Sequence, residues 1–109
     1  TFGYSSVASG QASAFNYQSI FLWTGGSTQS ITLSNSSGTE GQIITFVDCD
    51  SSNNNLIIYN ICQYNAGSLY NTTTNHLEMT DGGANVSVIK TNGKWFFLGR
   101  SGNVNWHKD

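Results

Sequence analysis

The sequence predicts an all-β protein whose short antiparallel strands form a meander and fold into a sandwich or barrel. Apolar runs recur between turn-forming residues along most of the chain, and no amphipathic helical pattern is found. The segment 76–99 is the most informative, because Asp81-Gly82-Gly83 and Asn92-Gly93 separate three apolar runs. Asp-Gly and Asn-Gly tolerate the positive φ angles of two-residue hairpin turns. We therefore expect three meandering strands over 77–98.

The remaining elements follow in chain order within a single β domain, 1–109. Residues 1–16 are rich in Ser, Ala and Gly and predict an extended leading segment or linker, with a weak helix over 5–15 as the alternative. Two runs, 42–48 and 56–61, are apolar on both faces, which indicates strands buried on two sides. The predicted strands before and after the meander are 17–23, 30–33, 42–48, 56–61, a short strand near 68–70, and an edge strand over 103–106.

The composition excludes several classes of function. Only 9% of the 109 residues are charged, against roughly 25% in ordinary soluble domains, and the formal net charge is −2. Nucleic-acid binding is therefore not expected. No apolar run is long enough for a membrane span, so membrane insertion is not expected either. The chain opens Thr-Phe-Gly-Tyr without a basic leader, which favours an excised domain or a processed product.

The predicted strands leave sheet edges and apolar faces uncovered. Natural monomers protect edge strands with Lys, Pro or inward-pointing charges. This chain has no Pro, and its lysines are confined to Lys90, Lys94 and Lys108. A monomer of this size buries only about two-thirds of its unfolded surface. We therefore predict an obligate homo-oligomer, with a homotrimer as the expected state.

The two cysteines predict free buried thiols. If 43–49 and 56–62 formed one hairpin, Cys49 and Cys62 would lie at its opposite ends, roughly 20 Å apart at ~3.4 Å per residue. That separation exceeds the ~7 Å Cα limit for a disulfide. A bridge within or between chains remains the alternative.

The ionisable residues suggest no catalytic or metal site. Asp48 and Asp50 flank Cys49 and share one strand face, and with Glu40, Glu78 and Asp81 they are candidate cation ligands. No calcium-loop motif is present, so a solvated loop end is favoured. His76 and His107 are too few and too isolated for a zinc site. No catalytic residue, metal or cofactor is predicted.

The aromatic residues divide into two groups. Tyr59, Tyr64, Tyr70 and Trp106, beside many Asn and Ser side chains, are candidates for stacking against sugars or for a subunit interface. Trp95, Phe96 and Phe97 are consecutive and must alternate between two faces of one strand. Trp95 and Phe97 are therefore interpreted as structural, together with the turn residues Asp81, Gly82, Gly83, Asn92 and Gly93.

Four segments together resemble a module of viral fibres. The segments are 30–33 (Ser-Ile-Thr-Leu), 41–48 (Gly-Gln-Ile-Ile-Thr-Phe-Val-Asp), 55–59 (Asn-Leu-Ile-Ile-Tyr) and 83–99, which ends in Asn-Gly-Lys-Trp-Phe-Phe-Leu-Gly. Phage tail fibres, tail spikes and large-virus surface proteins carry similar modules, and the likeness spans about residues 30–99. It implies a trimeric β module on the virion surface, outside cells, with a structural Trp95 and no catalytic residue.

Three functions are considered, in decreasing order of support. The first is a structural trimerisation or capping domain of a viral fibre or virion surface protein, which is not an enzyme and whose partner is itself. The second is a receptor-binding tip that attaches to host cell-surface carbohydrate through the tyrosines and Trp106. The third is a fibre-associated glycan hydrolase with Asp48, Asp50 and Asp81 at a subunit boundary.

Overall fold

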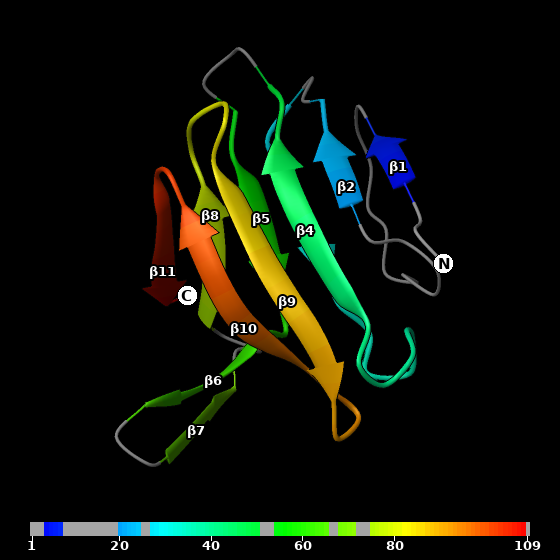
Figure 1. Ribbon diagram of the computed structural model, residues 1–109. Helices are drawn as coiled ribbons and strands as arrows, with labels where there is room; N and C mark the ends of the chain where they lie inside the picture. Colours follow the sequence, from blue (N-terminus) through cyan, green and yellow to red (C-terminus); the bar gives the residue numbers. More distant parts are fainter. Residues whose placement is uncertain are drawn as a thin grey trace.

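Two β-sheets face each other and enclose one core (Figure 1). The computed structural model describes residues 4–7, 20–24, 27–50, 54–65, 68–71 and 75–108. No helix occurs in these ranges, which confirms the all-β prediction, and so none of their elements is a membrane-spanning helix. The radius of gyration is 12.9 Å, close to the ~13 Å of a compact domain of this length.

Sheet A contains seven strands in the order β1-β2-β4-β9-β10-β6-β7, and sheet B contains four in the order β11-β8-β5-β3. Both sheets mix parallel and antiparallel pairs. In chain order the strands are β1 (Tyr4–Val7), β2 (Ile20–Trp23), β3 (Gln29–Thr32), β4 (Ile43–Asp48), β5 (Leu56–Tyr59), β6 (Cys62–Asn65), β7 (Ser68–Asn71), β8 (Asn75–Met79), β9 (Asn85–Thr91), β10 (Lys94–Ser101) and β11 (Val104–Lys108).

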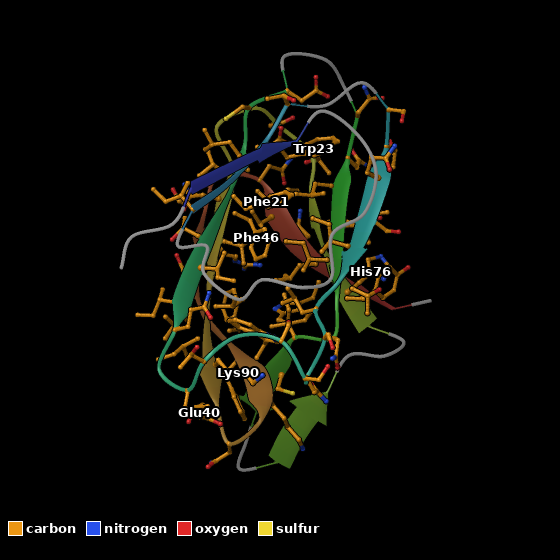
Figure 2. All side chains as sticks on the ribbon, turned by 90° about the vertical axis from the view of Figure 1, so that its right-hand side faces the viewer. Phe21, Trp23, Glu40, Phe46, His76 and Lys90 are labelled. Carbon is orange, nitrogen blue, oxygen red and sulfur yellow. The ribbon has the colours of Figure 1, made fainter. Side chains whose placement is uncertain are left out.

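The core lies between the sheets and follows from strand alternation. Every second residue of β4, β5 and β9 is buried, and the residues between them face away from the core. Figure 2 shows Phe21, Trp23 and Phe46 of sheet A in this interior, with the rings of Phe21 and Phe46 5.4 Å apart. Sheet B contributes the buried side chains Ile31, Leu56, Ile58, Leu77, Met79 and Val104.

The N-terminal half of the chain alternates between the two sheets. It passes from β2 in sheet A to β3 in sheet B, returns to β4 beside β2, and continues to β5 beside β3. Both neighbouring pairs are parallel, with Ile20 opposite Thr45 and Gln29 opposite Leu56. The prediction of purely antiparallel strands is wrong here, and so is the supposed hairpin of 43–49 with 56–62, because these segments lie in different sheets.

Only the second turn of the predicted meander is a hairpin. Asn92 (φ 53°) and Gly93 (φ 72°) join antiparallel β9 and β10, as their positive φ angles require. The first turn instead leads from β8 in sheet B to β9 in sheet A. Its backbone is tied to β4, because the Gly83 N–H donates to the Asp48 carbonyl at 2.7 Å. A β-carbon on Gly82 would meet the Asp50 carbonyl at 2.6 Å, so this corner requires glycine.

Two shorter features complete the fold. Asn60 adopts φ 68° directly after β5, and its side-chain amide donates to the Leu33 carbonyl at 2.6 Å. This corner turns the chain into β6, a strand that the sequence did not predict. The predicted strand near 68–70 is found as β7, and the predicted edge strand near 103–106 is β11. Within the leading segment, β1 is an edge strand, and residues 8–16 lie outside the described residues.

Candidate functional site

The outward side of sheet A carries an apolar row. Ile43 of β4 lies opposite Ile89 of β9, which lies opposite Phe96 of β10. Directly opposed residues share a sheet face, and the burial pattern places this row away from the core. Leu98 follows at an irregularity in the β9–β10 register. We call Ile43, Ile89, Phe96 and Leu98 the outer apolar row; Ile43 is 47% and Leu98 51% exposed.

Each sheet also has two edge strands, which lack a strand neighbour on one side among the described residues. Sheet A ends in β1 and β7, and sheet B ends in β3 and β11. An edge strand presents unpaired backbone N–H and C=O groups to any chain that approaches it. Three of these four strands are only four residues long (β1, β3 and β7), which limits how much ladder a partner strand gains.

An acidic cluster lies where β4 meets the corner at Asp81. Asp48 is 1% exposed, and its Oδ1 accepts the Asp50 backbone N–H at 2.9 Å. Its Oδ2 has no hydrogen-bond partner among the described residues. Burial raises the pKa of Asp48; the Asp50 backbone N–H opposes the shift, and the charges of Asp50 and Asp81 add to it. The protonated carboxyl is thus favoured more than in an exposed aspartate.

This acidic cluster is poorly placed for catalysis or for a metal. A general acid must touch the oxygen that it protonates, yet Asp48 is 1% and Asp50 only 7% exposed. Among the described residues, no three His, Cys, Asp or Glu side chains converge closely enough to hold a metal ion. Glu40 lies elsewhere, where it accepts the Gly93 N–H at 2.8 Å. Glu78 lies on β8 beside His76.

A buried lysine joins the loop after β3 to the β9–β10 hairpin. Lys90 Nζ donates to the backbone carbonyls of Asn35 (2.6 Å) and Ser37, and lies 5.4 Å from the centroid of the Trp95 ring. The Trp95 indole N–H in turn donates to the Ser34 carbonyl at 3.0 Å. Figure 2 shows Lys90 and Glu40 near the same end of the molecule. We call Lys90, Trp95 and the carbonyls of Ser34, Asn35 and Ser37 the lysine clasp. Sequence reasoning did not single out Lys90, because a lone lysine in a strand gives no sign that it is buried.

The four candidate sugar-stacking residues do not form one surface. Tyr59 lies on the outer side of sheet B, where its ring is 4.9 Å from that of His76. Trp106 packs against the core and contacts Phe97 edge-on at 5.7 Å. Tyr64 and Tyr70 are on β6 and β7, in strand positions whose side chains the structure does not describe. The structure thus separates Tyr59 from Trp106.

The structural residues and the cysteines are found as follows. Trp95 is fully buried and Phe97 packs partly against the core.

Both cysteines are free, as predicted. The prediction that both are buried is wrong for Cys49, which is exposed just beyond β4, whereas Cys62 is buried. Cys49 escapes burial because alternation places Asp48 and Asp50 inward and the residue between them outward.

Comparison of the chain with family models, with curated proteins and with solved structures finds no match. Function is therefore inferred from the surfaces and clusters described above. Of these, the outer apolar row is the feature that points most directly to a partner, since single exposed apolar side chains are ordinary but a contiguous apolar patch marks an interaction surface.

Proposed function

We propose that this chain is a structural trimerisation or capping domain of a viral fibre or virion surface protein. The outer apolar row carries the proposal. In a single chain Ile43 and Leu98 are about half exposed, and Ile89 and Phe96 lie between them in register. Three copies that turn these rows toward a common axis remove the exposed half of Ile43 and of Leu98 from water, and each of these two side chains then contributes about half of the value for full burial, or about 0.8–1.5 kcal/mol.

The rigidity of the fold supports the same role. The lysine clasp and the Glu40–Gly93 hydrogen bond fix the loop after β3 to the hairpin that carries Phe96 and Leu98. The hairpin that carries part of the outer apolar row is thus fixed to the loop after β3 by the lysine clasp and by the Glu40–Gly93 hydrogen bond. Only four Lys and Arg residues occur in the chain, which limits trypsin-type cleavage of a protein exposed outside cells.

Sedimentation velocity at micromolar chain concentration tests the proposal. The wild type is expected to sediment as a trimer, and Ile43→Glu combined with Leu98→Glu as a folded monomer. Thr32→Glu is the matched control, because Thr32 is an exposed strand residue of sheet B and a charge there leaves the row intact. A folded, monodisperse wild-type monomer would eliminate the trimer, and a trimer that persists in the double variant would eliminate this interface.

A receptor-binding tip is the second candidate, and one observation favours it. Tyr59 presents an aromatic ring on the outer side of sheet B, in register with Thr32 on β3. Aromatic faces beside hydroxyl groups are suited to sugar recognition. A glycan array of host-derived sugars tests this role. Binding that Tyr59→Ala abolishes and Trp106→Phe retains supports it, and an array without signal removes it.

A further inference from the structure

The only Asn-Gly pair of the sequence, Asn92-Gly93, forms the turn between β9 and β10. Asn92 (φ 53°) and Gly93 (φ 72°) both take positive φ angles, and both residues are exposed. A β-carbon on Gly93 would meet no atom within 4 Å beyond its chain neighbours, so water reaches this side of the turn. The Asn92 side chain makes no hydrogen bond to a described residue. Its carboxamide therefore lies unrestrained in an open turn.

An asparagine in this position can lose its side-chain amide without an enzyme. The Gly93 backbone nitrogen gives up its proton to hydroxide and attacks Cγ of Asn92. The new N–Cγ bond closes a five-membered succinimide ring, the Cγ–Nδ2 bond breaks, and Nδ2 leaves as ammonia with a proton from water. A water molecule then opens the ring at one of its two carbonyl carbons and leaves aspartate or isoaspartate. Glycine favours the attack because no β-carbon obstructs its nitrogen.

Glu40 lies against the nitrogen that has to attack. Its Oε1 accepts the Gly93 N–H at 2.8 Å, and Figure 2 shows Glu40 at the same end of the molecule as Lys90 of β9. A hydrogen bond to a carboxylate is stronger than one to a neutral acceptor. The negative charge also opposes loss of the proton, because an amide anion would form beside a like charge. The carboxylate therefore holds the Gly93 nitrogen in its protonated, unreactive form.

A second asparagine with positive φ is protected in a different way. Asn60 has φ 68°, but its side-chain amide donates to the Leu33 carbonyl at 2.6 Å. The next residue, Ile61, is fully buried and β-branched, so its backbone nitrogen is hindered. Asn60 is thus restrained by its own side chain and by its neighbour, whereas Asn92 depends on Glu40.

We propose that Asn92 is a deamidation site of this protein and that the Glu40 carboxylate protects it. Both products alter the hairpin, since aspartate adds a carboxylate near Glu40 and isoaspartate lengthens the backbone of a two-residue turn. The register of a hairpin depends on the length of its turn, and this turn sets the pairing of Lys90 with Trp95. Deamidation therefore acts on the hairpin that contains the lysine clasp. The inference does not depend on the proposed function.

The test incubates the full chain in mildly alkaline buffer and follows the conversion of Asn92 by liquid chromatography and mass spectrometry of its peptides. Glu40→Ala is expected to convert about 3- to 10-fold faster than the wild type, as the loss of one exposed hydrogen bond to a charged group implies. Thr39→Ala is the matched control. Thr39 is exposed, and among the described residues it forms hydrogen bonds only through its backbone. This control is expected to convert at the wild-type rate.

Two further measurements accompany these variants, and circular dichroism establishes that each sample is folded. Glu40→Gln keeps the size of the side chain without its charge and is expected to convert faster than the wild type. The unfolded wild type in urea lacks the Glu40–Gly93 contact and is also expected to convert faster than the folded protein. Asn60 is expected to stay intact in every folded sample.

Four results would each overturn the proposal. They are wild-type rates at Asn92 in the folded Glu40 variants, equal acceleration by Thr39→Ala, conversion no faster in urea than in the folded wild type, and conversion of Asn60 together with Asn92 in a folded Glu40 variant.

Discussion

Replacing Lys90 with methionine tests whether the lysine clasp stabilises the fold. The Lys90 ammonium is buried and donates to two backbone carbonyls, those of Asn35 and Ser37. Methionine keeps the apolar stem and removes both donors. A buried carbonyl that loses its donor costs about 1–3 kcal/mol, which gives about 2–6 kcal/mol for two. Asn35 is exposed and its carbonyl regains water, so we expect a loss of about 2–4 kcal/mol in the free energy of unfolding.

The assay is equilibrium unfolding in urea, followed by tryptophan fluorescence at one fixed chain concentration, because association makes stability concentration-dependent. Lys94→Met is the matched control. Lys94 lies on the same hairpin and is half-buried, and its side chain makes no hydrogen bond to a described residue. We expect the control to stay within about 0.5 kcal/mol of the wild type, as surface substitutions usually do. If Lys90→Met is no more destabilising than Lys94→Met, the clasp does not stabilise the fold.

Three further predictions concern single positions. Gly38→Ala should destabilise more than Gly41→Ala, because both glycines have positive φ but only a β-carbon on Gly38 meets the Trp95 ring, at 2.5 Å; we expect an excess of about 1–3 kcal/mol in chemical unfolding, and equal losses would contradict this packing. Since the pKa of Asp48 is raised in the folded state, its protonated form contributes stability that is complete below the unfolded pKa of ~3.9 and is lost as pH rises through the folded pKa. Asp48→Asn should therefore become more stable relative to the wild type as pH rises, and parallel stability–pH curves would refute the assignment. Native protein should show one thiol per chain that reacts rapidly with a disulfide reagent, Cys49, and Cys49→Ser should show none; Cys62 should react only after unfolding.

The sequence allowed the positions of the strands to be predicted better than which strands pair with each other. Apolar runs located β4, β5, β9 and β10 to within a few residues, because burial between two sheets requires side chains of this kind wherever the strands pair. Pairing depends on residues far apart in the chain, such as Trp23 opposite Asp48, and no local pattern encodes it. The turn at Asp81 shows the same limit. Its glycines correctly predicted that the chain changes direction there. A hairpin turn and a corner between two sheets need the same backbone freedom, so the glycines did not distinguish between them.

The candidate site was predicted only in part. The sequence indicated that strands 42–48 and 56–61 lacked a face for water, and Ile43 of the outer apolar row lies at the start of the first of these. It did not show that Ile89 and Phe96 continue the same row across two further strands. It also treated His76 and His107 as isolated, since residues on β8 and β11 become neighbours only through a ladder formed after β9 and β10 have crossed to the other sheet.

The arrangement of edges and faces bears on how copies of the chain associate. Pairing between two different edge strands joins different surfaces of two molecules, and such contacts build open filaments unless their rotation happens to close. The short edges β1, β3 and β7 offer little ladder for that route. The outer apolar row lies instead on a broad strand face of sheet A, away from both edge strands of that sheet. Burying it around a common axis yields a closed assembly with a fixed number of chains, because each copy then has no row left for another. The proposed trimer therefore forms through a surface that is fully used once three chains have assembled. Edge-strand pairing is less favourable than this contact, because the short edge strands form few backbone hydrogen bonds.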